Sequence, residues 1–517
     1  MTNNAMWILV TLIIYFAMML LIGLYYAKQN TNSEDFFLGG RGLTGPVAAL
    51  SAQASDMSGW LLMGLPGAVY IFGTGQAWIA VGLFLGTVAN WLFIASPLRR
   101  YTIRANNSLT LPAFLENRFR DKKRILLGVS SLTISIFFLV YTASAFASGG
   151  KFFASVFGIT YYQALTISAF IILAYTFLGG FMAVCATDFI QGVLMLVALL
   201  VVPILAYATI KGGLSNILAS TNVPGGVAGY LDLFSNGERP YTAVEIISQL
   251  AWGLGYCGMP HILVRFMAVK NEKEMMKSKS IGITWVALSL FAACAIGIIG
   301  RAFLAPMVLE GSKSEYVFIQ MILKLFVEIN STPIIAGLFL CGILAAIMST
   351  ADSQLLVSAS SIAEDIFRGI VRPDAREKTV LFTSRITVLV VAILAYIIAL
   401  DPNSSIMKLV SDAWAGLGAA FGPTVLMSLF WRRCNFYGAF FGIVSGAVTV
   451  IVWDYIPLCG GVTPSDATGL YSLAVGFTIS LVCVVVASLV TKAPSEEILQ
   501  EFDDVRRDLK TKLAKRL

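Results

Sequence analysis

The chain has 517 residues, of which 57% are hydrophobic and only 13% are charged. A soluble protein of this length would carry about 25% charged residues, so the composition excludes a water-soluble enzyme or binding domain. The formal net charge is +7, from 36 Lys and Arg against 29 Asp and Glu, and a single histidine argues against histidine-based metal or triad chemistry.

Long apolar runs predict an all-α polytopic membrane protein. Runs of about 18 or more apolar residues with almost no charge are typical of transmembrane helices. We expect thirteen spans, at residues 6–26, 46–72, 77–97, 125–154, 161–179, 188–210, 242–263, 281–306, 333–361, 380–400, 407–431, 436–457 and 470–491. The segments between them are short, so we expect the protein to work inside its helical bundle, with the lipid bilayer as its surroundings.

Lys and Arg are distributed unevenly between the two sides. With the N-terminus outside, 29 of the 36 basic residues fall on the cytoplasmic side, among them the group from Arg265 to Lys279. This asymmetry follows the positive-inside rule and predicts that the N-terminus is outside and the C-terminus inside. The positive charge is therefore a topology signal, and no nucleic-acid partner is expected.

Two polar segments outside the expected spans are notable. Residues 313–326 have helical periodicity, and we expect them to lie on the outer surface. Residues 492–517 form a mixed-charge amphipathic tail, expected to be solvated or to rest on the inner leaflet. Neither is large enough for a catalytic or sensor domain, and no obligate protein partner is indicated.

The second span contains the polar segment Ala54–Gly59, with a carboxylate at Asp56, two hydroxyls and a glycine. Inserting a charged side chain at the centre of a membrane helix costs roughly 2.5–3.5 kcal/mol, so a residue such as Asp56 is expected to serve a function. Ser and Gly weaken the helix here, so carbonyls can be turned toward an ion. The structural alternative is a helix interface in which Asp56 pairs with a basic residue.

The seventh span is interrupted between Trp252 and His261 by three glycines and a proline. Broken helices at corresponding places in two halves indicate a transporter site near the bilayer midplane. The two broken spans are five spans apart, which predicts two repeats, spans 2–6 (residues 46–210) and spans 7–11 (residues 242–431), with spans 1, 12 and 13 appended.

The ninth span contains the stretch Ala345–Ser353, in which Ala346, Ser349, Thr350 and Ser353 share a helical face. Hydroxyls beside small residues suit a hard monovalent cation, although they can also bond back to their own helix. The intramembrane aspartates have no His, Cys or Lys at nucleophile spacing. A two-aspartate membrane protease is the only enzyme they suggest, and we expect a protein that is not an enzyme.

Three strings carry a resemblance to a known family: LGGRGLTGPVAALSAQASDMSGWLLMGLPGAVY, AWGLGYCGMPHILVRFMA and GILAAIMSTADSQLLVSASSIAEDI. They resemble the sodium:solute symporter family, and within it the bacterial sodium/proline symporters, over nearly the whole chain. The resemblance implies a LeuT-type fold with an inverted five-plus-five repeat and about thirteen helices. It also implies alternating-access symport of sodium ions and L-proline across the bacterial cytoplasmic membrane.

The resemblance also implies roles for individual residues. The sodium site would comprise Ala54, Met57, Ala346, Ser349 and Thr350, with Asp56 acting as a ligand or on the site. The proline pocket would be shaped by Ser58, Tyr141, Trp252, Tyr256 and Pro260. Coupling would involve Arg41, Gly64 and Gly337. A second cation site, present in some members, would use Asp188, Ser349, Asp352 and Ser353.

Two departures from the family pattern leave alternatives open. Position 352 is an aspartate where relatives with a second cation site have serine, so Asp352 strengthens that site, makes it proton-sensitive, or forms a surface ion pair with Arg385. Cys257 and Met259 replace an aromatic residue and a glutamine, which leaves another amino acid or a carboxylate as alternative solutes. The aromatic residues Trp252 and Tyr256 argue against a sugar as the solute. The lack of a repeated filter sequence argues against an ion channel. A sodium-dependent receptor is the more distant alternative.

Overall fold

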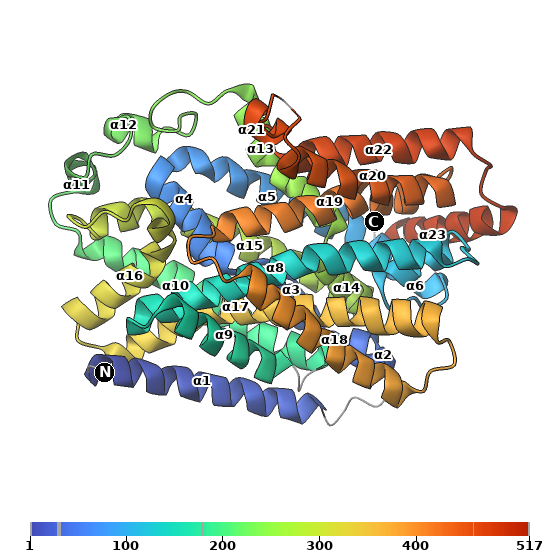
Figure 1. Cartoon of the computed structure of the whole chain (residues 1–517), viewed down its shortest axis with the longest axis horizontal. Coiled ribbons are helices and arrows are strands. Elements are labelled where there is room, and N and C mark those ends of the chain that lie inside the picture. The colour runs from blue at the N-terminus through green and yellow to red at the C-terminus, as the bar shows by residue number, and fades with distance from the viewer. Residues whose placement is uncertain (1–2, 28–32, 177–179, 459, 515–517) are drawn as a thin grey trace.

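The computed structural model describes residues 3–27, 33–176, 180–458 and 460–514, and it is built from helices and the segments that join them (Figure 1). The α-helices are α1 (Asn3–Ala27), α2 (Ser33–Leu38), α3 (Gly45–Asp56), α4 (Leu65–Phe72), α5 (Ala77–Ala89), α6 (Ala95–Arg104), α7 (Leu111–Arg118), α8 (Ile125–Phe157), α9 (Tyr161–Thr176), α10 (Phe181–Thr209), α11 (Leu214–Ser220), α12 (Gly226–Leu231), α13 (Ala243–Leu250), α14 (Pro260–Ala268), α15 (Glu272–Phe303), α16 (Val317–Leu323), α17 (Pro333–Ser360), α18 (Glu377–Ile398), α19 (Ile406–Phe430), α20 (Phe436–Tyr455), α21 (Pro464–Thr468), α22 (Ser472–Val490) and α23 (Glu496–Ala514).

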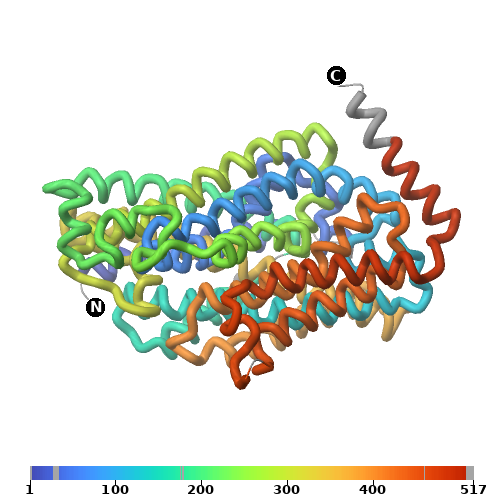
Figure 2. Tube along the Cα trace, turned by 90° about the horizontal axis from the view of Figure 1, so that it is seen from above, coloured from blue at the N-terminus to red at the C-terminus, as the bar shows by residue number. Residues whose placement is uncertain are grey.

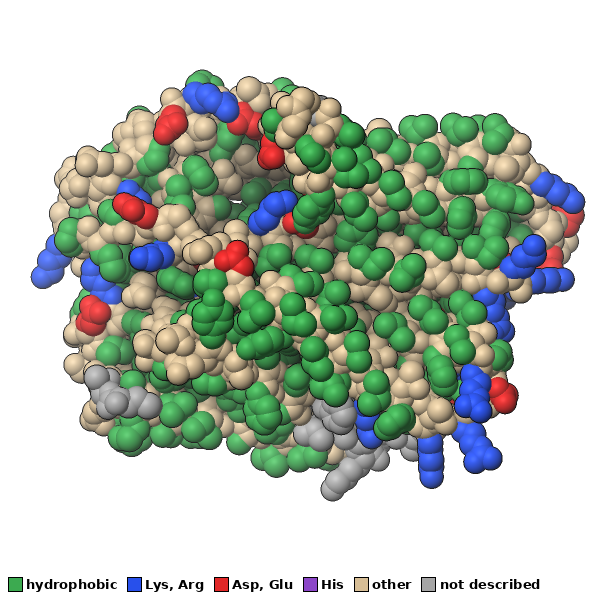
Figure 3. All heavy atoms as spheres, in the orientation of Figure 1, with side chains coloured by type: hydrophobic (Ala, Val, Ile, Leu, Met, Phe, Trp, Pro, Cys, Tyr) green, Lys and Arg blue, Asp and Glu red, His purple; other side chains and the backbone are tan. Residues whose placement is uncertain are grey.

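Within the described ranges, ten helical stretches are long and apolar enough to cross a membrane, and the shorter apolar stretches Trp60–Phe72 and Tyr161–Ala174 accompany them. The long helices run roughly side by side along the molecule (Figure 1). Charged side chains gather at the two ends, whereas a broad apolar surface lies between them (Figure 3). This distribution fits a protein that is embedded in a bilayer.

Both predicted helix interruptions are confirmed. Helix α3 ends at Asp56, and the chain resumes as a π-helical segment at Trp60–Gly64 before α4. At the break the amide of Ser58 donates to the carbonyl of Asp56 at 2.9 Å instead of to Ala54 four residues back. The second interruption is the 3₁₀ segment Ala251–Gly258, which separates α13 from α14, because three glycines and Pro260 weaken a regular α-helix here.

Glycines let the second interrupted helix approach α5 closely. A Cβ at Gly253 would lie 2.1 Å from the backbone oxygen of Gly82, and one at Gly86 would lie 2.2 Å from the oxygen of Gly253. Neither contact can be relieved by rotating a side chain. The position of the 251–258 segment therefore depends on these residues having no side chain.

We expect Gly253→Ala to lower the stability of the folded protein by at least about 2 kcal/mol, because overpacking against backbone atoms forces the two segments apart. The measurement is the thermal melting of the detergent-purified protein. Gly23→Ala is the matched control, since nothing lies within 4 Å of the new methyl group in α1. Equal melting temperatures for the two variants would contradict this account of the packing.

Residues 313–326, predicted to be helical and to lie on the outer surface, include helix α16. In α16 the side chains of Val317, Phe318, Ile319, Met321 and Ile322 are all buried. This helix packs against α4, α15 and α17. The apolar periodicity indicated a helix correctly, but it did not reveal that other helices, rather than the membrane surface, would cover its apolar residues.

The tail was expected to be solvated or to rest on the inner leaflet, but the described part of α23 packs on the protein. The Phe502 ring is 2% exposed, and the guanidinium of Arg118 lies 5.4 Å from its centroid. Arg120 forms an ion pair with Glu501 at 2.5 Å. Figure 2 shows α23 at one end of the molecule, beside the end of the bundle. The tail is thus anchored by both apolar and ionic contacts.

Candidate functional site

Four of the six residues predicted for the sodium site lie together in the buried core. The hydroxyl of Ser349 donates to the carbonyl of Ala54 at 2.8 Å, and that of Thr350 donates to the same carbonyl at 3.4 Å. Ser349 also donates to the carbonyl of Ala346 at 3.3 Å. Because α3 is interrupted at Ser58, the carbonyl of Ala54 is free to face α17 rather than the next turn of its own helix. These contacts form a cluster of hydroxyl and carbonyl oxygens.

Met57 and Asp56 lie at the break itself. Met57 is fully buried and adopts the non-helical conformation that ends α3. The carboxylate of Asp56 faces the other interrupted helix, where its Oδ2 accepts a hydrogen bond from the hydroxyl of Tyr256 at 2.7 Å. Among the described residues, its Oδ1 is buried and has no hydrogen-bond partner. Asp56 therefore joins the oxygen cluster to the second interrupted helix.

Three of the residues predicted to bind the solute lie beside Asp56, and Pro260 lines a different pocket. Tyr256 and Tyr141 contact it directly, since the Tyr141 hydroxyl donates to the Asp56 carbonyl at 3.5 Å, and Ser58 is buried two residues further along. Pro260 begins α14 and lines a different, small pocket together with Phe37 of α2. The structure thus brings Ser58, Tyr141 and Tyr256 together, whereas the described contacts place Pro260 only in the small pocket beside α2.

Trp252 lies between this buried group and an open cavity of about 700 Å³. Its indole stacks on the ring of Tyr471, with centroids 5.2 Å apart and an interplanar angle of 22°. The Tyr471 hydroxyl donates to the carbonyl of Ser411 at 2.7 Å, which ties it to α19. Gly64 lines the same cavity. The sequence analysis missed Tyr471, because nothing near position 471 marks it as a partner of a residue more than two hundred positions earlier.

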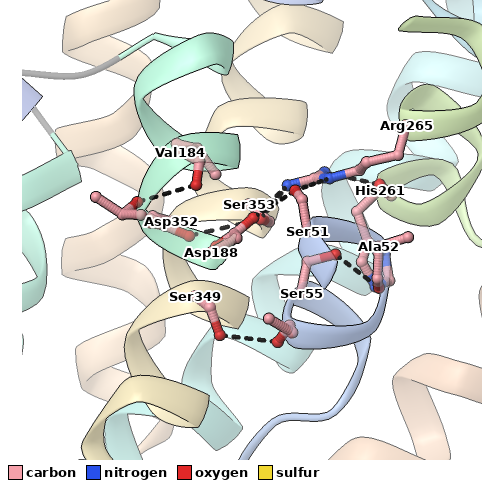
Figure 4. Close-up of polar contacts among 12 residues, drawn as sticks. Ser51, Ala52, Ser55, Val184, Asp188, His261, Arg265, Ser349, Asp352 and Ser353 are labelled. Carbon is pink, nitrogen blue, oxygen red and sulfur yellow. Dashed lines mark hydrogen bonds and ion pairs between the residues drawn. The ribbon is translucent and has the colours of Figure 1, made fainter. Parts of the chain in front are cut away.

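Asp188, Asp352 and Ser353, predicted to form a second cation site, lie in one buried region (Figure 4). The Ser353 hydroxyl is 3.5 Å from Oδ1 of Asp352. The carboxylate of Asp188 accepts a hydrogen bond from Ser51 at 2.7 Å and forms an ion pair with Arg265 at 3.3 Å. Ser51 and Arg265 are therefore additional members that the sequence analysis did not assign to this site.

Two expectations about these residues are wrong. Arg265 was counted with the cytoplasmic basic residues, but its side chain is 0% exposed because α14 carries it into the bundle. Asp352 is likewise 0% exposed, so its carboxyl group does not lie at the surface. A signal for Arg265 was present in the sequence, since it follows Pro260 by little more than one helical turn on an apolar segment.

Arg41, predicted to act in coupling, connects three parts of the chain at one end of the bundle. Its guanidinium donates to the Met267 carbonyl at 2.7 Å, to the Ser108 carbonyl at 2.9 Å and to Asn107 Oδ1 at 2.9 Å. Burial and the neighbouring Arg99 lower the pKa of Arg41 to about 10, so it remains charged at neutral pH. It therefore bonds both to the end of α14 and to the segment between α6 and α7.

Gly337, the third predicted coupling residue, lies where α17 crosses α1. A Cβ at this position would be 2.7 Å from Cβ of Thr11. Gly337 therefore allows close approach of these two helices and is far along α17 from Ser349 and Thr350. No contact in the described residues brings it to the oxygen cluster.

Comparisons with known proteins agree with this architecture. The model of the sodium:solute symporter family matches residues 36–446. The chain is 41% identical to the osmoregulated proline transporter OpuE of Bacillus subtilis, covering 98% of this chain and 99% of that protein. It is 44% identical to the high-affinity proline transporter PutP of Bacillus subtilis, covering 94% and 98%, and 42% identical to sodium/proline symporter 2 of Staphylococcus saprophyticus, covering 97% and 96%.

Among solved structures, a Na⁺-coupled sialic acid symporter in a substrate-bound outward-open state matches with a TM-score of 0.75 at 18% identity, covering 95% of this chain and 99% of that one. This likeness concerns the fold. The family match and the full-length relatives settle the class of protein. The chain belongs to the sodium:solute symporter family and is a multi-pass transporter of the bacterial cytoplasmic membrane, not an enzyme.

Proposed function

We propose that the protein couples the inward flow of sodium ions to the uptake of L-proline by alternating access. The structural observation that carries the proposal is the hydrogen bond between Asp56 and Tyr256, which joins two interrupted helices beside a cluster of hydroxyl and carbonyl oxygens. Interrupted helices that meet in this way are typical of solute and ion sites in secondary transporters. The choice of proline rests on the three relatives named above.

Sodium is proposed to bind between α3 and α17, with ligands from Ala54, Met57, Ala346, Ser349 and Thr350. Sodium is a hard cation that prefers oxygen ligands, and the Ser349 and Thr350 hydroxyls already converge on one freed carbonyl. The carboxylate of Asp56 would add a negative charge nearby, and its unpartnered Oδ1 supports such a role.

Proline is proposed to bind on the other side of Asp56, with Ser58, Tyr141, Trp252, Tyr256 and Pro260 shaping its pocket. Aromatic rings suit a compact apolar ring, and the exposed N–H groups of an interrupted helix suit a carboxylate. Trp252 also lies at the boundary with the open cavity, so its stack with Tyr471 would have to open when solute enters.

The topology is also a proposal. We infer thirteen spans in a LeuT-type inverted repeat, with residues 46–210 and 242–431 as the two halves, the N-terminus outside and the C-terminus inside. Residues 1–491 would form the transporter domain and residues 492–517 its cytoplasmic tail. The similarity in fold to the sialic acid symporter and the two interruptions, five predicted spans apart, support this arrangement.

In the proposed cycle, sodium binds first and fixes the interrupted end of α3, which forms the proline pocket. The loaded carrier then opens inward, a step that would involve Arg41, Gly64 and Gly337. Coupling of this kind is reciprocal, so proline should also tighten the binding of sodium. Each sodium ion adds about 2.3 kcal/mol per 100 mV of membrane potential, which concentrates a neutral zwitterion roughly fiftyfold.

The test is uptake of radiolabelled L-proline into proteoliposomes with an inward sodium gradient, compared with an equal potassium gradient. We expect accumulation with sodium only. If sodium enters the vesicles but proline does not, the ion site stands and another amino acid or a carboxylate is the solute. Uptake that is independent of sodium would contradict the proposal.

A further inference from the structure

Asn90 bonds to the second interrupted helix from a helix that carries none of the residues assigned above. It is the first residue of the π-helical turn Asn90–Ile94, which continues α5, and its side chain is buried. Its Nδ2 donates to the backbone carbonyl of Tyr256 at 3.1 Å. Turns of this kind occur frequently at functional sites. Tyr256 is therefore held twice, at its carbonyl by Asn90 and at its hydroxyl by Asp56.

The carbonyl of Tyr256 needs an outside donor because of the proline that follows it. In an α-helix this carbonyl would accept a hydrogen bond from the backbone N–H of the residue four positions later. That residue is Pro260, which has no N–H. A buried backbone carbonyl without a partner is destabilising, and the amide of Asn90 supplies the donor that the proline cannot.

The face of α5 that carries Asn90 explains how its side chain reaches the interrupted segment. Gly82, Gly86 and Asn90 recur at intervals of four residues, so they lie on one helical face. The two glycines let the backbone of α5 touch that of Gly253. Asn90 follows one turn later with a side chain that can form hydrogen bonds. The glycines thus set the distance between the two segments, and one hydrogen bond fixes their orientation.

Packing alone does not account for an asparagine here. Its Oδ1 is buried and has no hydrogen-bond partner within the part of the chain that the structure describes, and a buried polar atom without a partner lowers stability. At the other end of the segment, Trp414 of α19 donates from its Nε1 to the carbonyl of Trp252 at 2.8 Å. Two side chains from different helices therefore hold the carbonyls of Trp252 and Tyr256, both of which are proposed to shape the solute pocket.

We propose that Asn90 is a positioning residue of the solute site. By holding the carbonyl of Tyr256, it keeps the hydroxyl of that residue on Asp56, and it thereby sets the affinity for the solute without touching the solute itself. This inference rests on the proposed function, since it concerns the pocket that Tyr256 is proposed to shape. It adds α5 to the helices that determine solute affinity.

The first experiment compares the affinities for proline and for sodium. Asn90→Leu keeps a side chain of similar size and removes the amide donor, so the KM for proline in proteoliposomes should rise about tenfold. Sodium binding to the purified protein without proline should change less than about twofold, because the Ser349 and Thr350 hydroxyls are untouched. Trp78→Phe is the matched control. It removes an indole donor to the Leu233 carbonyl from the beginning of the same helix and should change neither value.

A double-mutant cycle tests whether Asn90 acts through Tyr256. Tyr256→Phe removes the hydroxyl that Asn90 is proposed to position, so Asn90→Leu should raise the KM for proline less than about twofold further in that background. Effects that multiply in the double variant would overturn the proposal. So would an unchanged KM for proline in Asn90→Leu, or a loss of sodium affinity as large as the loss of proline affinity. Asn90→Ala takes the place of the leucine variant in the cycle if the latter does not fold.

Hydrogen exchange separates this inference from the proposed function. In sodium-loaded protein without solute, the amides of residues 251–258 should exchange about tenfold faster in Asn90→Leu than in the wild type. Trp78→Phe should leave their exchange unchanged. Equal exchange in Asn90→Leu and the wild type would overturn the positioning role, whichever solute is carried. If the wild type accumulates no proline with sodium, the proposed function fails, and the exchange experiment still decides whether Asn90 holds the segment.

Discussion

Asp56→Asn is expected to raise the sodium concentration that gives half-maximal proline uptake by about 30-fold. The substitution keeps the size of the side chain and an oxygen that can accept the Tyr256 hydrogen bond, but it removes the negative charge. A unit charge about 8 Å from a cation contributes roughly 2 kcal/mol at an effective dielectric constant of about 20, which corresponds to a factor of about 30. The measurement is the sodium dependence of uptake at a fixed, low concentration of proline.

Two controls separate the charge from the hydrogen bond. Tyr256→Phe removes the hydroxyl that donates to Asp56 but keeps the charge, so it should weaken the apparent affinity for proline more than that for sodium. Lys313→Ala changes an exposed residue that belongs to neither proposed site. It should leave the apparent affinities for proline and for sodium unchanged. If Asp56→Asn and Lys313→Ala had equal effects, the proposed position of the sodium site would be wrong.

The interruptions in the two helices could be predicted from the sequence because their causes are local. Ser58 and Gly59 weaken α3, and the glycines before Pro260 end the helix that begins with α13. Which carbonyls are freed follows directly from where the helix ends. The placement of Ser349 against the Ala54 carbonyl required the family resemblance as well, because those residues are 295 positions apart.

The contacts of Arg265 could not be predicted in the same way. A basic residue just beyond the end of an expected span is usually cytoplasmic. The apolar residues around Arg265 indicate a buried segment, but only the packing of α14 among α3, α10 and α17 shows which groups its side chain contacts. The docking of Phe502 on Arg118 is similar, since amphipathicity indicates that a helix has an apolar face but not what covers it. In each case the deciding contact is distant in sequence.

The hydroxyl of Thr350 offers the second decisive prediction. Thr350→Val replaces that hydroxyl with a methyl group of similar size, so it should raise the half-maximal sodium concentration for uptake by roughly tenfold or more. Loss of one polar partner in a buried site costs about 1–3 kcal/mol, and about 1.4 kcal/mol corresponds to a factor of ten. The measurement is uptake over a range of sodium concentrations with proline held at saturation.

Thr350→Ser is the matched control, because it keeps the hydroxyl that lies 3.4 Å from the Ala54 carbonyl and removes only a methyl group. It should behave nearly as the wild type does at every sodium concentration. If serine and valine impaired transport equally, the methyl group rather than the hydroxyl would matter, and Thr350 would be a packing residue of α17. A defect confined to valine, and overcome by high sodium, would instead identify the hydroxyl as a ligand, since an excess of the ion compensates for weaker binding but not for a distorted helix.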